Sequence, residues 1–235
     1  MSGVYGYFGV TTSGKTTLAL EHLRLDVGAD GKPSLILDCM PAKNLRQFRH
    51  SENRLEVVDL LYVKGTHAVY TPKDEEDLAA LFDVIHFAGS KEQTPIHVLW
   101  DEASIHQSPL SIDDRIAVAL RGWQHNDCTF RLVTQRPGDL HGVFYSCIPE
   151  VYCFRLERMR DLERVRGELS LPTEVIAAQP QGKYETYSRD RFKKVAAHEP
   201  PPPPAPAAPA PPPAPAPDDG SVQRDDVVQP EPGAA

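Results

Sequence analysis

Residues 9–16 read Gly-Val-Thr-Thr-Ser-Gly-Lys-Thr, and they constrain the fold more than any other part of the 235-residue chain. The octapeptide matches the pattern G-x-x-x-x-G-K-[ST] at every fixed position. An apolar, aromatic run at residues 3–8 precedes it, and a segment with helical spacing follows it. A glycine-rich turn between a strand and a helix offers backbone N–H groups and a helix N-terminus to phosphate groups. We therefore expect a strand, a phosphate-binding loop and a helix over residues 3–25.

Two side chains of this motif have separate roles. Lys15 would reach the β- and γ-phosphates of a nucleoside triphosphate, and Thr16 would hold Mg²⁺. ATP and Mg²⁺ are thus the expected substrate and cofactor, against the alternative of a chance glycine-rich turn. The expected phosphate-binding positions are Gly9, Val10, Thr11, Thr12, Ser13, Gly14, Lys15, Thr16 and Thr17.

Short apolar runs alternate with helical segments through the rest of the first 198 residues. Helical patterns with polar outer faces cover 74–89, 112–124 and 158–169. Apolar runs typical of strands cover 34–38, 96–100, 129–135 and 151–156, with weaker strand patterns at 56–63, 67–71 and 183–188. This alternation predicts an α/β fold with a mostly parallel central sheet flanked by helices.

Residues 199–235 differ sharply in composition. They hold 14 of the 23 prolines, in a proline- and alanine-rich run with an acidic end. Such a segment buries little apolar surface, and proline keeps it near the polyproline II conformation. We predict one folded domain at 1–198 and a disordered tail at 199–235. The tail is interpreted as a spacer that presents its acidic end, a polyproline ligand, or a dispensable solubilising segment.

Overall charge says little about the ligand. The net charge of −8 comes largely from the tail, because residues 1–198 hold 24 basic and 27 acidic side chains. No apolar run approaches the ~18–20 residues that span a bilayer, and the N-terminus has no signal-peptide pattern. The four cysteines have no metal-type spacing, which is typical of reduced thiols. We expect a cytoplasmic protein without stable membrane insertion.

A pair of acids follows the apolar run at 96–100. Asp101 would orient the hydration shell of Mg²⁺, and Glu102 would polarise the attacking water as a general base. The alternative for Glu102 is the first residue of a helix, where the helix dipole favours an acid. Gln135 ends another predicted strand. A polar amide at that position of such a sheet lies in the ligand crevice and could contact the γ-phosphate or the water.

The combination of GVTTSGKTT, LILDCMPAKN, VLWDEAS and RLVTQRPGDL resembles the FtsK–HerA superfamily of P-loop ATPases, over about residues 3–168. A compact single domain within it is most similar to the viral genome-packaging ATPases. The resemblance implies a RecA-like core, a homo-oligomeric ring that is often a hexamer, and ATP-driven movement of double-stranded DNA. It also implies a capsid vertex or portal protein as partner, and a place in the host cytoplasm or with the virion.

The resemblance assigns the metal role to Asp101, water activation to Glu102 and the sensor role to Gln135. Where the family often has an arginine ahead of the sensor glutamine, this chain has Gln124. Arg121 is our first candidate for an arginine finger acting on the neighbouring subunit's nucleotide, and Arg115 is the second. The alternative is that Arg121 is an ordinary surface residue.

Other interpretations stay open at this point. The arginine-rich segment 155–166 carries interleaved acids, which favours a solvated, salt-bridged helix face over a DNA contact. A nucleoside kinase resembling type II thymidine kinases also combines such a loop with an acid pair. A filamentous-phage-type assembly ATPase, or a scaffold that hydrolyses ATP slowly, would carry the same motifs.

Overall fold

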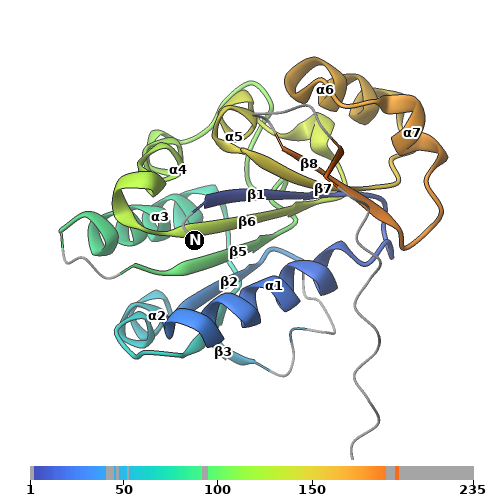
Figure 1. The fold of residues 1–235 in the computed structure, drawn as a ribbon. Coiled ribbons are helices and arrows are strands. Elements are labelled where there is room, and N and C mark those ends of the chain that lie inside the picture. The colour runs from blue at the N-terminus through green and yellow to red at the C-terminus, as the bar shows by residue number, and fades with distance from the viewer. Residues whose placement is uncertain are drawn as a thin grey trace, which may run out of the picture. The chain divides into compact units, whose positions relative to one another are not determined.

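The computed structural model describes residues 3–40, 45, 48–51, 53–91, 95–188 and 194–195. Within them, nine strands form one sheet in the order β3-β4-β2-β5-β6-β1-β7-β8-β9 (Figure 1). Neighbouring strands from β3 to β7 are parallel, and β8 and β9 add to that edge antiparallel. The predicted α/β fold with a mostly parallel sheet is therefore confirmed. The strands are β1 (Gly3–Phe8), β2 (Ser34–Asp38), β3 (Arg49–Ser51), β4 (His67–Tyr70), β5 (His97–Asp101), β6 (Thr129–Thr134), β7 (Glu150–Phe154), β8 (Tyr184–Ser188) and β9 (Lys194–Val195).

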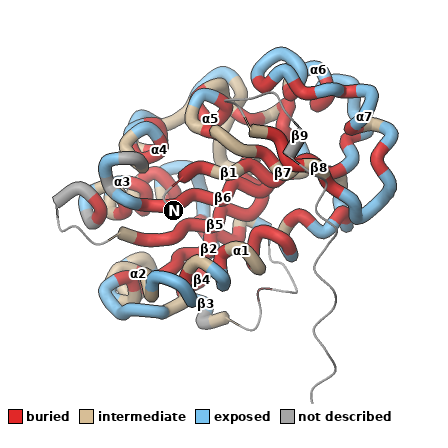
Figure 2. Tube along the Cα trace, in the orientation of Figure 1, coloured by how far each residue is buried: buried red, intermediate tan, exposed pale blue. Residues whose placement is uncertain are grey.

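Helices cover both faces of the sheet and bury two apolar clusters against it. One cluster joins α1 to β1, β2, β5 and β6, and the other joins α2, α3, α4, α5 and α6 to the opposite face. The strands are buried along most of their length, whereas the outer sides of the helices are exposed (Figure 2). The helices are α1 (Lys15–Asp30), α2 (Arg54–Leu61), α3 (Glu75–Lys91), α4 (Asp114–Asn126), η2 (Pro137–Asp139), α5 (Gly142–Cys147), α6 (Met159–Leu169) and α7 (Thr173–Ala178).

The strand predicted at 56–63 is wrong, because α2 occupies Arg54–Leu61. The Asn53 side chain caps this helix by accepting a hydrogen bond from the Leu55 backbone N–H. Val57 and Leu61 lie one helical turn apart and are both buried. The flanking strands β3 and β4 are parallel, so their connection must cross over the sheet, which a helix does and a third strand would not.

Several short elements carry too little periodicity to be predicted, namely β3, α5, α7 and β9. The weak strand patterns at 67–71 and 183–188 do form β4 and β8. The proline-rich segment 199–235 lies outside the described residues, so its separation from the domain stays a prediction.

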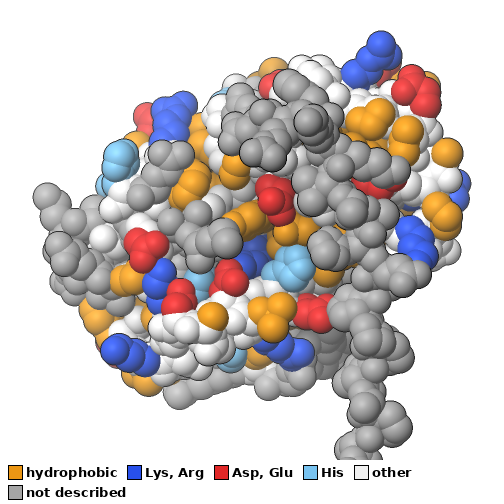
Figure 3. All heavy atoms as spheres, viewed as in Figure 1, with side chains coloured by type: hydrophobic (Ala, Val, Ile, Leu, Met, Phe, Trp, Pro, Cys, Tyr) orange, Lys and Arg blue, Asp and Glu red, His pale blue; other side chains and the backbone are white. Residues whose placement is uncertain are grey.

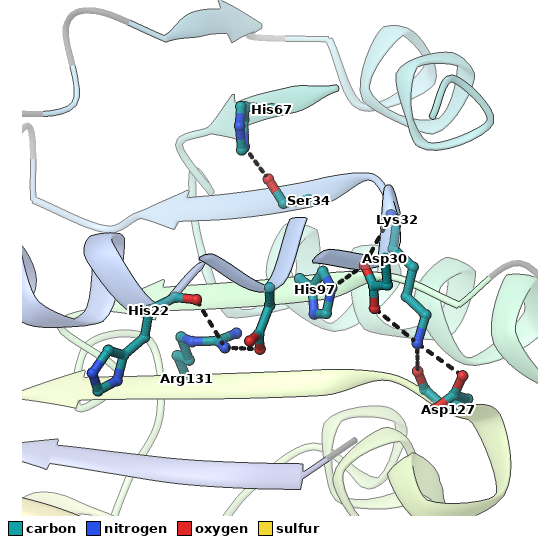
Figure 4. Close-up of polar contacts among 9 residues, drawn as sticks. His22, Asp30, Lys32, Ser34, His67, His97, Asp127 and Arg131 are labelled. Atoms are coloured by element: carbon teal, nitrogen blue, oxygen red, sulfur yellow. Dashed lines mark hydrogen bonds and ion pairs between the residues drawn. The ribbon is translucent and has the colours of Figure 1, made fainter. Parts of the chain in front are cut away.

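Buried polar contacts fasten α1 to the sheet (Figure 4). Arg131 of β6 is only 2% exposed, forms an ion pair with Asp26 of α1, and donates to the His22 carbonyl at 3.4 Å. At the end of α1, Asp30 Oδ1 lies 3.0 Å from Nε2 of the fully buried His97. These contacts hold the second half of α1 against β5 and β6.

His97 makes the fold sensitive to acid. Burial lowers the pKa of His97 below its ordinary value of 6.5, although its contact with Asp30 opposes the shift. As the pH falls, His97 is therefore protonated more readily in the unfolded chain than in the folded chain. The contribution of His97 to the free energy of unfolding is highest above pH 6.5 and decreases as the pH falls through that value. We expect the stability advantage of wild type over His97→Gln to shrink between about pH 7.5 and 5.5. Urea unfolding of both proteins at several pH values measures it, and a constant difference would contradict this assignment.

Candidate functional site

The predicted site residues come together at one edge of the sheet, where parallel strands end. The phosphate loop follows β1, Asp101 ends β5 and is followed by Glu102, and Gln135 follows β6. These three strands are adjacent in the order β5-β6-β1, with β6 between the loop and the acids. Gln135 therefore lies between the loop and the acid pair.

The loop at residues 9–14 is held by backbone contacts to both neighbouring strands. The Gly9 N–H donates to the Thr134 carbonyl at 3.3 Å, and the Val10 N–H donates to the Arg155 carbonyl at 3.0 Å. Gly14 has a φ of 94°, a left-handed conformation that favours glycine, and it starts α1 without a side-chain cap. The first N–H groups of α1 thus have no capping side chain, which suits a phosphate ligand.

Gly9 sits where a larger residue would not fit. A Cβ atom built there would lie 2.5 Å from Phe154 Cβ and 2.9 Å from Ser13 Oγ. We expect Gly9→Ala to displace the loop and weaken ATP binding by at least about tenfold. Gly28→Ala in α1 is the matched control, since a Cβ there meets nothing within 4 Å. Equilibrium binding of a fluorescent ATP analogue checks both variants. Unchanged affinity for Gly9→Ala would show that the loop accommodates the added Cβ atom without losing binding free energy.

Lys15 points from the start of α1 towards the centre of the site. Its side chain is buried, and Nζ donates to the Val10 carbonyl at 3.3 Å and lies 4.0 Å from Glu102 Oε1. Burial lowers the pKa of the Lys15 ammonium, while Glu102 and Asp101 oppose the shift. A buried cation beside the loop attracts the phosphates of a nucleotide.

Thr16 and Asp101 form the contact expected of a magnesium site. Thr16 Oγ1 donates to Asp101 Oδ1 at 3.0 Å. Burial raises the pKa of Asp101 to about 6, with the charges of Glu102 and Asp38 adding to the shift and the bond from Thr16 opposing it. Within the described part of the chain, no three His, Cys, Asp or Glu side chains could together hold a metal. The residues fit Mg²⁺, which binds through one or two protein oxygens, phosphate oxygens and water.

Glu102 does not begin a helix, so that alternative is wrong. It lies in a turn with a left-handed φ of 53°, and α4 begins only at Asp114. Its carboxylate is buried and accepts two hydrogen bonds from Gln135, from Nε2 at 2.5 Å and from the backbone N–H at 3.3 Å. Non-glycine residues in this conformation concentrate at functional sites.

Neither arginine-finger candidate forms a hydrogen bond or ion pair with the phosphate loop among the described residues. Arg115 Nη2 is ion-paired with Glu76 at 2.6 Å and with Asp113 at 2.8 Å. Arg121 is exposed and forms no ion pair with the described residues. Arg121 lies in the half of α4 that leads into the start of β6, whereas the phosphate loop follows the end of β1, which is parallel to β6. A finger role for Arg121 on the nucleotide of a neighbouring subunit therefore stays a proposal.

Two features of this edge were missed in the sequence. Asp38 is buried at the end of β2 and pairs in register with Asp101 across the sheet, which adds a third carboxylate to the site. The acid is visible in the sequence, but only the strand order places it beside Asp101. Beside the loop, a cleft of about 410 Å³ includes Thr11, Gln135 and three exposed arginines, namely Arg136, Arg155 and Arg158.

Three side chains of the arginine-rich segment form ion pairs. Arg155 lies 3.3 Å from Glu157, Arg160 lies 3.2 Å from Asp139, and Arg164 lies 3.1 Å from Glu168 on α6. On the molecular face of Figure 3, acidic and basic side chains are likewise intermixed. Only the pair of Arg155 with Glu157 uses one of the interleaved acids, so the predicted salt-bridged face forms in part.

Comparison with known proteins defines the class of this fold. No protein-family model matches the chain, and no curated protein matches it in sequence. Among solved structures, the chain has the fold of a viral genome-packaging NTPase, which agrees with the sequence resemblance at the level of the fold.

Genome-packaging NTPase B204 from Sulfolobus turreted icosahedral virus 2 is the most informative of these structures. Its complex with ATP-gammaS superposes with a TM-score of 0.71 and 19% identity, over 85% of this chain and 98% of that one. The sulfate complex of B204 gives a TM-score of 0.70 at 19% identity, over 85% of this chain and 96% of that one. VirB4 of Thermoanaerobacter pseudethanolicus gives 0.56 at 7% identity, over 84% and 89% of the two chains. No helix among the described residues is long and apolar enough to cross a bilayer.

Proposed function

We propose that this protein is an ATPase that moves double-stranded DNA into a viral capsid. The observation that carries the proposal is the meeting of Lys15, Glu102 and Gln135 beside an uncapped helix N-terminus. Support comes from the fold, which matches a viral genome-packaging NTPase along nearly the whole of that protein. On this proposal the protein works in the host cytoplasm or attached to the virion.

Substrate binding follows from the loop. The backbone N–H groups of residues 9–16 and the start of α1 would surround the β- and γ-phosphates, and the Lys15 ammonium would contact them. Thr16 and Asp101 would hold Mg²⁺, which when bound offsets phosphate charge and favours the ionised form of Asp101. Burial around Lys15 and Asp101 strengthens these interactions relative to water.

Glu102 is the base in this proposal. Its carboxylate would accept a proton from the water that attacks the γ-phosphate. Gln135, which donates two hydrogen bonds to that carboxylate, would keep it oriented and would sense the phosphate beside the loop. The γ-phosphate is then released as inorganic phosphate, and ADP stays in the loop.

A ring of identical subunits would complete the site. Arg121 lies in the half of α4 that leads into the start of β6, at the sheet edge opposite the loop, so a finger role for it would need a neighbouring copy of the chain. We propose a homo-oligomeric ring, with a hexamer as the first expectation, which threads duplex DNA and docks on a capsid vertex or portal protein. Arg121→Ala should then reduce turnover only under conditions in which the ring forms.

The direct test measures ATP turnover and particle size, with and without Mg²⁺ and linear duplex DNA. Assembly with ATP and a rise in turnover on adding DNA would support the translocase. A monomer that is indifferent to both would overturn it. Phosphate transfer to thymidine would favour the kinase, and nucleotide-driven assembly without DNA stimulation would favour the assembly ATPase or scaffold.

A further inference from the structure

A chain of hydrogen bonds joins the phosphate loop to the acid pair. Thr11 Oγ1 donates to Gln135 Oε1, and Gln135 Nε2 donates to Glu102 Oε1 at 2.5 Å. Glu102 Oε1 also lies 4.0 Å from Lys15 Nζ, so the chain ends beside the lysine of the same loop. Thr11 is therefore the loop side chain that contacts Gln135 directly.

The chemistry of the amide makes the contact directional. A carboxylate only accepts hydrogen bonds, so it favours the NH₂ end of Gln135, and the amide oxygen is left to face Thr11. The threonine hydroxyl supplies the donor which that oxygen needs. Without it, the exposed side of the amide would bond to water and be free to rotate away from Glu102.

The loop side of the contact is itself held in place. Thr12 Oγ1 donates to the Thr11 carbonyl at 2.6 Å and accepts from Gln181 Nε2 at 3.2 Å. Thr12 has a left-handed φ of 63°, which turns the chain sharply after Thr11. The Thr11 hydroxyl is thus directed at Gln135 by the conformation of the loop.

We propose that Thr11 is a positioning residue that anchors Gln135 and, through it, the carboxylate of Glu102. The inference rests on the proposed ATPase function and names a residue of that site with no role in the motif pattern itself, where its position is variable. Because Thr11 belongs to the loop that surrounds the phosphates, the same bond links loop conformation to the orientation of the base.

Thr11→Val keeps the shape of the side chain and removes its hydroxyl. We expect ATP turnover to fall about tenfold, as for the loss of one hydrogen bond, with the affinity for a fluorescent ATP analogue within about twofold of wild type. Thr11→Ser keeps the donor and should restore most of the turnover. Thr71→Val, at an exposed threonine outside the site, is the matched control and should behave as wild type.

A double-mutant cycle with Gln135→Ala separates positioning from a general structural effect. If Thr11 acts through Gln135, Thr11→Val should change turnover little once that amide is gone. The inference would be overturned if Thr11→Val lowered turnover equally with Gln135 present and with Gln135 replaced by alanine. It would also be overturned if Thr11→Val turned over ATP at the normal rate, or if its affinity for the ATP analogue fell as much as its turnover. A wild-type chain without turnover would instead overturn the proposed function, and the inference with it.

Discussion

Lys15→Met is expected to lower ATP turnover by at least about a hundredfold, comparable to the loss of a charged or hydrogen-bonding group at a transition state. Methionine keeps the length of the side chain but brings no charge to the phosphates. The fold should survive, because burial lowers the pKa of Lys15, which means that the folded protein disfavours this charge. Steady-state release of phosphate measures the effect, and thermal unfolding checks the fold.

Lys64→Met is the matched control for this substitution. Lys64 is exposed in the connection between α2 and β4, far in sequence from every site residue, and its replacement should leave turnover unchanged. Binding of the ATP analogue should weaken for Lys15→Met alone. Normal turnover by Lys15→Met would mean that the loop does not hold the reacting phosphates, and the proposed function would fall.

Glu102→Gln should abolish most hydrolysis while ATP still binds. General bases contribute about 10²- to 10⁴-fold to rates, and a glutamine has no basic oxygen to accept the proton. The replacement is isosteric, and its amide oxygen can still accept the bond from Gln135 Nε2, but the bond from the Gln135 backbone N–H is lost because the new NH₂ group only donates. Single-turnover hydrolysis and equilibrium binding, measured on the same preparation, separate the two effects.

Glu174→Gln in α7 controls for the change of one acid, since Glu174 is exposed and lies outside the site. We expect the Glu102→Gln protein to retain bound ATP and not to release phosphate. If that protein hydrolyses ATP at the wild-type rate, Glu102 is not the base, whatever its position in the structure.

Local chemistry made much of the fold predictable. The runs at 34–38 and 96–100 are apolar and bounded by polar residues, and they form β2 and β5. The acidic first turn at Glu75–Asp77 similarly marks the start of α3. The strand predicted at 56–63 was wrong because its adjacent valines favour a strand locally. The parallel pairing of β3 with β4 requires a crossover connection there, and α2 provides it.

The site was predictable only in part. The phosphate loop is one continuous segment, so its spacing alone identifies Lys15 and Thr16. The contact between Glu102 and Gln135 needed the strand order, because β6 brings Gln135 next to the acid. Asp38 was not predicted as a site residue, because its place beside Asp101 depends on the register between β2 and β5. A pattern within one segment of the sequence does not reveal that register. The finger arginine depends on a second subunit and stays a proposal.

By itself, the sequence indicated most of the longer strands and helices and the loop proposed to bind phosphate, because both depend on residues close together along the chain. The tertiary structure decided the order of the strands, and with it the contact between Thr11 and Gln135, which are 124 residues apart. The physical reason is that side chains from separate strand ends meet only after buried surfaces of many segments have packed, and that packing is a property of the whole domain.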